Sequence, residues 1–237
     1  MAILSGIHPV AEALRAQHPI DRLLVAQGAG GPRLQEIIDM ARRASVPVRF
    51  EPRAALDRLA GTSAHQGVVA MGAARKYADL DRAAASEMLV VLDGVEDPHN
   101  LGAIIRTAHA AGAGSVVIPE RRAAGVTDVV AKAAAGAIEH LPVVRVTNIN
   151  RTLAELKERG HWIYGLDKRG VEDCDRVEYA SPTVFVLGGE GKGLHEQVRK
   201  HCDVLVRIPL AGKISSLNVS VAAGIVLFEW KRRRAPG

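Results

Sequence analysis

The sequence predicts an α/β fold, with a mostly parallel sheet in the larger second part of the chain and a smaller α/β unit in front of it. Apolar residues make up 48% of the 237 residues but aromatic residues only 3%, so Ala, Val, Leu and Ile must fill the core, as is usual in α/β layers. Six apolar runs after residue 87 are mostly continuous rather than alternating, which is typical of strands buried on both faces of a parallel sheet. Helical segments separate these runs, which indicates a doubly wound domain.

The first part of the chain, residues 1–75, has the pattern of a compact α/β unit. A polar helical pattern spans 34–44, and apolar runs predict strands over 22–26, 46–50 and 65–70. This part contains nine arginines, no lysine and six acidic residues, which gives a net charge of +3. The next segment, 76–87, is charged, rich in alanine and without a strand pattern, so we expect it to be a linker.

The second domain is expected over residues 88–237. Its six predicted strands are 88–92, 115–118, 143–146, 162–166, 183–187 and 204–208. A helix is predicted from Asn100 to Ala111, with Asn100 capping its start and Gly112 its end. The last helix, from about Leu217, has one apolar stripe made of Val221, Ile225 and Phe228. It ends in Lys231–Arg234, where cations either suit the helix dipole or contact RNA.

Composition limits the classes of partner and location. The formal charge of +5 and the isoelectric point near 9.5 favour a polyanionic partner, although a solvated basic surface would give the same charge. The few aromatic residues argue against an exposed base-stacking platform. Cys174 and Cys202 are far apart and the nine histidines lack metal-ligand spacing, so we expect no disulfide and no metal. Without a basic leader or an apolar run of about 20 residues, we expect a cytoplasmic protein with no membrane partner.

A glycine-rich segment, Gly188–Gly193, follows the fifth predicted strand of the second domain. A loop after such a strand is where a nucleotide-like cofactor binds in α/β proteins. The segment is not a P-loop, because Val186 stands where the first glycine is needed and Gly193 stands where Ser or Thr should follow Lys192. A plain strand-to-helix turn is the alternative to a cofactor role.

Two other segments join a predicted strand to a predicted helix. After the first strand, a polar loop leads into the helix that carries Arg106, which is either functional or a surface arginine paired with an acid. After the last strand, Pro209 and Gly212 interrupt regular pairing and leave backbone groups free to read an adenine edge. Ser216 and Asn218 come at the start of the next helix, where capping by Ser215 or Ser216 is the alternative role.

In this order, the three segments resemble the three signature motifs of the SpoU/TrmH branch of the SPOUT superfamily of knotted methyltransferases. Asp97–Ala108 resembles the first motif, Val186–Gly193 the second and Ile208–Ser220 the third. The segments Gly6–Leu14 and His65–Ala70 are similar to the L30e-like substrate-binding domain of this class. With Ala135–Val143, the chain looks most like the bacterial enzymes that methylate a guanosine ribose in the peptidyl-transferase region of 23S rRNA.

The resemblance implies a homodimer with a C-terminal trefoil knot, S-adenosylmethionine as cofactor and RNA rather than DNA as substrate. It implies that the cofactor lies against Gly188, Gly189, Gly191, Ile208, Leu210 and Leu217. It also implies a catalytic surface made of Asn100, Arg106, Glu190, Ser216 and Asn218. Methylation of a tRNA ribose by the same chemistry, or a catalytically silent RNA-binding assembly factor, are the alternatives. Intact Arg106 and Glu190 argue against the silent protein.

Overall fold

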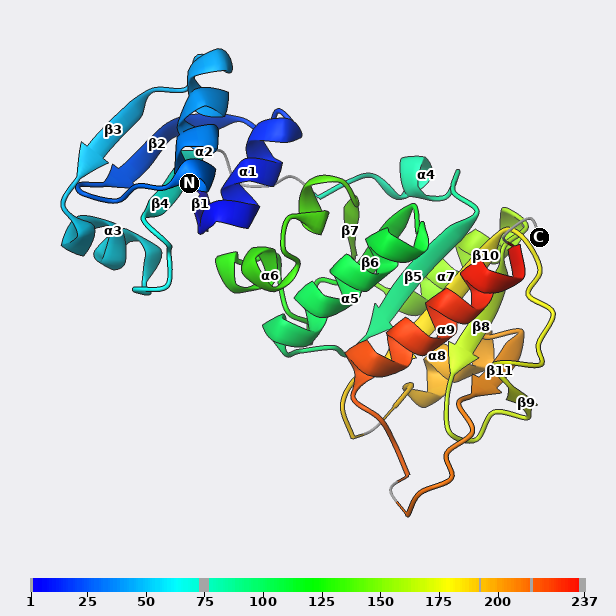
Figure 1. The fold of residues 1–237 in the computed structure, drawn as a ribbon. Helices are drawn as coiled ribbons and strands as arrows, with labels where there is room; N and C mark the ends of the chain where they lie inside the picture. The colour runs from blue at the N-terminus through cyan, green and yellow to red at the C-terminus, as the bar shows by residue number, and fades with distance from the viewer. Residues whose placement is uncertain (1, 73–76, 192, 214, 235–237) are drawn as a thin grey trace. The chain divides into compact units, whose positions relative to one another are not determined.

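The computed structural model describes residues 2–72, 77–191, 193–213 and 215–234 (Figure 1). The chain forms two compact units. Unit 1 comprises Met1–Lys76 and Val126–His140, and unit 2 comprises Tyr77–Gly125 and Leu141–Gly237. Residues 73–76, where the predicted first domain meets the predicted linker, lie outside the described residues. No helix of the described part of the chain is long and apolar enough to cross a membrane.

Unit 1 is built on a four-stranded sheet with the order β1-β4-β2-β3. The strands are β1 (Ala2–Ser5), β2 (Ile20–Ala26), β3 (Val48–Glu51) and β4 (Val68–Gly72). Strand β4 pairs antiparallel with β1 and β2, whereas β2 and β3 are parallel because a helix connects them. The predicted strand over 65–70 begins only at Val68, because the buried His65 ring accepts the N–H of Gly67 and forms a turn.

Helices cover the sheet of unit 1 on both faces. They are α1 (Ile7–Arg15), α2 (Pro32–Arg43), α3 (Arg53–Ala60), α6 (Asp128–Ala133) and the short 3-10 helix η1 (Ala137–Glu139). Under α3, an apolar cluster joins Leu56 to Leu24 and Val69 of the sheet. The segment 126–140 falls inside the predicted range 88–237, yet it packs against α1 and β1 of unit 1. There is no room for a Cβ at Gly136, because that atom would lie 2.1 Å from Cγ of Glu12.

Unit 2 contains a seven-stranded, parallel sheet with the order β7-β6-β5-β10-β8-β11-β9. The strands are β5 (Met88–Asp93), β6 (Ser115–Pro119), β7 (Val143–Val146), β8 (Trp162–Leu166), β9 (Glu172–Asp173), β10 (Thr183–Gly188) and β11 (Val204–Arg207). All six predicted strands are confirmed, and the predicted parallel α/β fold is correct. The additional strand, β9, has two polar residues at the sheet edge and no apolar run to predict it.

The helices of unit 2 are α4 (Leu80–Ala83), α5 (Pro98–Ala111), α7 (Ile149–Glu158), α8 (Glu196–His201) and α9 (Val219–Arg234). On one face of the sheet, Leu153, Leu156 and Val198 of α7 and α8 pack against strand residues such as Val184. Helices α5 and α9 lie side by side (Figure 1). Trp230 of α9 donates a 3.0 Å hydrogen bond from Nε1 to Thr183 Oγ1, which ties α9 to β10.

Two helix starts differ from the prediction. Asn100 does not cap α5: Asp97 is the cap, its Oδ1 accepts the His99 N–H at 2.9 Å, and Pro98 occupies the first helical position. The predicted end at Gly112 is confirmed, since this glycine has the left-handed φ of 92°. Helix α9 starts at Val219 rather than Leu217, and Asn218 caps it by accepting the Ser220 N–H at 2.8 Å.

The predicted apolar stripe of α9 faces outward. Val221, Ile225 and Phe228 are 52%, 39% and 45% exposed. The buried side chains of this helix include Ala223, Val226, Leu227 and Trp230. Helix α9 is thus apolar on nearly every side, and the exposed stripe is a second apolar face beyond the one that packs on the sheet.

The basic end of α9 binds protein atoms. Lys231 Nζ donates to the carbonyl of Ala110, the second-last residue of α5, at 2.9 Å. Arg232 and Arg233 bind Glu229, and Arg233 also donates to the Asp175 carbonyl. Arg234 stacks over the Trp230 ring at 4.6 Å. These contacts hold the end of α9, where the cations also suit the helix dipole as expected from the sequence.

Candidate functional site

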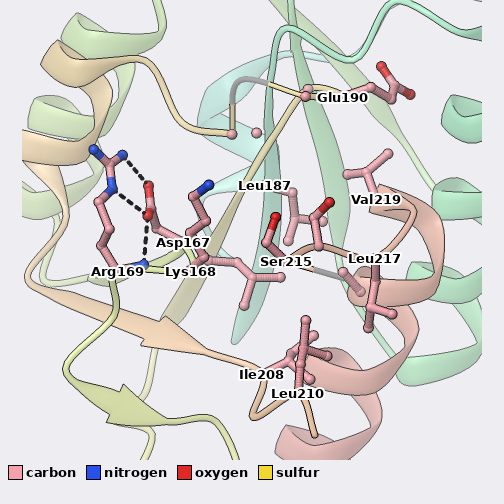
Figure 2. A pocket seen from close by; sticks show the side chains of 17 residues that line it. Asp167, Lys168, Arg169, Leu187, Glu190, Ile208, Leu210, Ser215, Leu217 and Val219 are labelled. Atoms are coloured by element: carbon pink, nitrogen blue, oxygen red, sulfur yellow. Dashed lines mark hydrogen bonds and ion pairs between the residues drawn. The ribbon is translucent and has the colours of Figure 1, made fainter. Parts of the chain in front are cut away.

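A cavity of about 330 Å³ lies at the carboxyl ends of β10, β8 and β11, the edge of a parallel sheet at which α/β proteins bind ligands (Figure 2). Three connections form its wall: the loop after β10, the turn after β8 and the loop between β11 and α9. All six residues expected to bind a cofactor line it, namely Gly188, Gly189, Gly191, Ile208, Leu210 and Leu217.

The glycine loop is closed by backbone contacts that side chains would prevent. A Cβ on Gly188 would lie 2.1 Å from the carbonyl carbon of Gly193, and one on Gly189 would lie 2.0 Å from the Gly94 oxygen. Gly191 has a φ of 78°, which favours glycine. The glycines therefore shape the loop itself. Lys192 of this motif lies outside the described residues.

The loop between β11 and α9 presents unpaired backbone. The described residues between Ile208 and Leu217 form no backbone-to-backbone hydrogen bond with other described residues. Their N–H and C=O groups are therefore available to a ligand, as Pro209 and Gly212 suggested. Ser215 and Ser216 line the cavity and are exposed, and neither caps α9.

Three residues expected to be catalytic are joined by hydrogen bonds. Asn100 Nδ2 donates to Glu190 Oε1, and Asn218 Nδ2 donates to Asn100 Oδ1 at 3.0 Å. Asn218 Oδ1 in turn accepts from the backbone N–H and the hydroxyl of Ser220, at 2.8 and 2.6 Å. The Glu190 carboxylate points away from the other labelled side chains of the cavity (Figure 2). One residue from each motif thus meets at the cavity rim.

Arg106 lies apart from this network. It is exposed on α5 and makes no hydrogen bond or ion pair with another described residue. It follows Asn100 by six residues, which puts the two side chains about 120° apart around the helix. The acid partner that the alternative interpretation needs is not present among the described residues, and the geometry within one chain does not bring Arg106 to Glu190.

The structure adds three polar cavity residues that the sequence interpretation missed. Asp167, Lys168 and Arg169 follow β8 directly. The buried Asp167 carboxylate accepts from Arg169 Nε and Nη2 at 2.8 Å each, and these bonds lower the pKa of Asp167 below its ordinary value. A polar triplet directly after a buried strand was the available signal.

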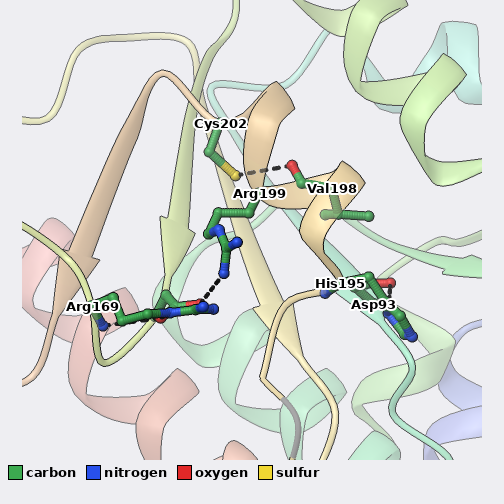
Figure 3. Close-up of polar contacts among 7 residues, drawn as sticks. Asp93, Arg169, His195, Val198, Arg199 and Cys202 are labelled. Atoms are coloured by element: carbon green, nitrogen blue, oxygen red, sulfur yellow. Dashed lines mark hydrogen bonds and ion pairs between the residues drawn. The ribbon is translucent and has the colours of Figure 1, made fainter.

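Another hollow, of about 470 Å³, lies next to the glycine loop and shares Gly189, Glu190 and Gly193 with the first. Asp93, the last residue of β5, accepts the backbone N–H of His195 at 2.8 Å and lies 2.9 Å from its Nδ1. Figure 3 shows this pair at the start of α8. In the same view, the side chain of Arg199 points toward Arg169. The Gly189 N–H also donates to the Asp93 carbonyl, at 2.8 Å. Asp93 therefore anchors both ends of the glycine loop.

The first cavity fits a nucleoside that carries an amino-acid group. Its apolar side chains suit a flat ring, and its free backbone groups suit the polar edge of an adenine. These apolar residues are Leu166, Leu187, Ile208, Leu210, Leu217 and Val219. Lys168 supplies a cation for a carboxylate, whereas both oxygens of Asp167 already bind Arg169. The described residues hold no group of three or more His, Cys, Asp and Glu side chains that could bind a metal ion.

Two family models together match most of the chain. The model of the SpoU rRNA methylase family matches residues 87–228, which contain the sheet and both hollows. The chain belongs to the SpoU rRNA methylase family. A second model, described as RNA 2′-O ribose methyltransferase substrate binding, matches residues 3–78 of unit 1.

Relatives and solved structures agree with this assignment. YacO of Bacillus subtilis strain 168, assigned to the TrmH family of tRNA/rRNA methyltransferases, is 45% identical over 98% of this chain and 95% of its own. The SpoU methyltransferase AviRb of Streptomyces viridochromogenes, in complex with AdoMet, has a TM-score of 0.86 and 29% identity over 99% of this chain and 91% of its own. An AdoMet-bound rRNA methyltransferase of Sinorhizobium meliloti has a TM-score of 0.83 and 26% identity over 100% and 88%.

The family fixes the general activity. This SpoU/TrmH-family protein is a methyltransferase that uses S-adenosylmethionine as methyl donor and RNA as substrate. The first cavity is bounded by the second and third motifs.

Proposed function

We propose that this enzyme transfers the methyl group of S-adenosylmethionine to the ribose 2′-hydroxyl of a guanosine in the peptidyl-transferase region of 23S rRNA, in the cytoplasm. The observation that carries the proposal is the hydrogen-bonded set Asn100, Glu190 and Asn218 at the rim of the cavity. The match of residues 3–78 to a 2′-O ribose substrate-binding domain supports the ribose as acceptor.

Positioning supplies much of the rate in this reaction. When bound, the cofactor supplies an electrophilic methyl group, and the acceptor oxygen must approach it in line. Gly188, Ile208 and Leu217 would hold the adenosine, and Lys168 the carboxylate of the amino-acid group. Asn100 and Asn218 have fixed amide orientations, so together with Glu190 and Ser216 they would orient the ribose.

Arg106 is assigned to the acceptor side as a fork that binds a phosphate and stabilises the developing alkoxide. It is a poor base, because a guanidinium stays protonated in proteins and offers donors but no acceptor. The hydroxyl proton would leave through phosphate or water.

A homodimer would complete the site. The exposed stripe Val221, Ile225 and Phe228 runs along α9, beside the helix that carries Arg106. An apolar stripe of this kind on a soluble protein favours contact with another chain. Pairing of two copies through this face would bury the stripe and place Arg106 of one protomer against its partner, where it can reach the partner's network.

Methylation of a tRNA ribose by the same residues is the second candidate, since the family covers both RNA classes. A methyl-transfer assay distinguishes the two substrates. Purified enzyme and labelled S-adenosylmethionine are incubated either with a 23S rRNA fragment of the peptidyl-transferase region or with bulk tRNA. Incorporation into the rRNA fragment alone, at one guanosine that lacks ribose methylation in a deletion strain, supports the proposal. Incorporation into tRNA alone contradicts the rRNA assignment.

A further inference from the structure

The aromatic residue of unit 1 lies on its surface. Phe50 is the only Phe, Tyr or Trp in the sequence of this unit, and it is 52% exposed. It belongs to β3, an edge strand of the sheet. Its register partner in β2, Val25, is fully buried. Phe50 therefore continues the apolar face of the sheet onto the edge strand, where the ring is half exposed. A lone aromatic residue is the side chain a small core would be expected to bury.

Arginines gather at the same end of the sheet. Arg49 precedes Phe50, and Arg53 opens α3 two residues after β3 ends. Strands β2 and β3 are parallel, so α2, which begins shortly after β2, also starts at this end and brings Arg33 there. These three arginines and Phe50 are all exposed, and we call them the β3 patch.

The arginines of the β3 patch have no carboxylate partner among the described residues. Arg33 and Arg49 make no ion pair, and Arg53 donates only to the Ser63 carbonyl, at 3.3 Å. Arg15 and Arg42, elsewhere on this unit, are each paired with an acid. The nearest acid in sequence is Glu51. By strand alternation Glu51 and Arg49 share the face opposite Phe50, so the ring and Arg49 lie on the two sides of the edge strand. The β3 patch is therefore the cationic end of an edge strand, with one aromatic ring exposed on one face of that strand.

We propose that the β3 patch is where unit 1 holds an unpaired RNA base, with Phe50 stacking on the base and the arginines neutralising the flanking phosphates. The proposal deepens the proposed function and rests on its RNA substrate. Every base has a face that stacks on an aromatic ring, and guanidinium groups suit phosphates. An unneutralised cationic surface favours RNA over an apolar protein partner. The few aromatic residues argued against an exposed base-stacking platform. The proposal departs from that expectation, because one exposed ring is enough to stack one base.

The test measures binding of the full chain to a fluorescent 23S rRNA fragment with unpaired bases. F50A should bind about tenfold or more weakly, with an unchanged slope of log K against log salt, because stacking releases no counterions. F50W should bind as the wild type does. R49Q and R53Q should each reduce the slope by roughly 0.7 for single-stranded RNA, and R42Q, a matched loss of a paired arginine, should reduce it less.

Three outcomes would overturn the assignment: wild-type affinity in F50A, wild-type affinity in F50L, which keeps apolar bulk without a ring, or a loss in F50A that follows a change of oligomeric mass in sedimentation. Methyl transfer on the same RNA reports on the proposed function separately. If the wild type methylates the RNA and F50A binds it with wild-type affinity, only the role of the β3 patch is contradicted. Binding that depends on Phe50 without transfer to RNA contradicts the proposed function alone.

Discussion

The side-chain amide of Asn218 donates a 3.0 Å hydrogen bond to Oδ1 of Asn100, across 118 residues of sequence. Because that oxygen is an acceptor, Nδ2 of Asn100 is free to donate to Glu190, and the bond to Glu190 fixes which way the amide points. The first and third motifs thus determine together how the carboxylate of the second is held. This relationship makes the three motifs one unit, so their loss should not be additive.

Asn100→Ala should reduce methyl transfer by about a hundredfold, because it removes both the donor to Glu190 and the acceptor from Asn218 and lets the site shift. The affinity for S-adenosylmethionine should change by less than a few-fold, since Asn100 does not line the first cavity. Asn148→Ala is the matched control: this residue caps α7 through Arg151 N–H, so its loss should cost about 1 kcal/mol of stability and little activity. Equal activity of the two variants would contradict the network's role.

Arg106→Ala should abolish nearly all methyl transfer yet keep cofactor affinity within a few-fold, because Arg106 is assigned to the acceptor side. Single-turnover transfer and calorimetry measure the two quantities. Parallel losses of transfer and cofactor affinity would show that the assignment to the acceptor is wrong.

Gly188→Val should remove cofactor binding, because a Cβ there would lie 2.1 Å from Gly193 and force the loop open. Gly212→Ala provides the control, since a Cβ at Gly212 has no neighbour within 4 Å. Calorimetry with S-adenosylmethionine should show no detectable heat for the first variant and near wild-type affinity for the second. Unchanged affinity in Gly188→Val would mean that the cofactor binds elsewhere.

Arg169→Ala should lower the free energy of unfolding only slightly at pH 7, since Arg169 is half exposed and its ion pair is screened. The pKa of Asp167 is lowered in the folded state, chiefly by Arg169, so the pair stabilises the fold above the ordinary pKa of an aspartate. That contribution disappears as the pH falls through the lowered pKa. Urea unfolding should therefore show a smaller difference between variant and wild type at pH 3 than at pH 7. A difference that grows in acid would contradict this sign.

The sequence predicted the strands of unit 2 well because burial on both faces leaves a local signature, a continuous apolar run. It did not predict β9, whose two residues Glu172 and Asp173 pair only because β11 lies beside them. The predicted start of α5 was wrong because Asn100 is a residue type that commonly caps helices. Pro98, which occupies the first helical position, was the better signal.

Site residues could be predicted from the sequence where they belong to one motif. They could not be predicted where only the order of strands in the sheet brings them together. Gly188, Ile208 and Leu217 came from two motifs, and the order β10-β8-β11 brings Asp167 between them. The polar triplet after β8 marks a strand end, but no residue near Asp167 indicates that β8 lies between β10 and β11. The packing of 126–140 on unit 1 is equally non-local, since it depends on contact with Glu12.

The central claim is transfer to a ribose 2′-hydroxyl, and a matched pair of RNA fragments that differ by one 2′-deoxy substitution at the target guanosine tests it most directly. Binding should survive, because phosphates and shape supply most of the affinity and one hydroxyl supplies at most a hydrogen bond of ~1 kcal/mol. Incorporation of labelled methyl should fall to background on the deoxy fragment, because the acceptor oxygen is gone. Continued transfer to the deoxy fragment would contradict ribose 2′-O chemistry and indicate methylation of a base.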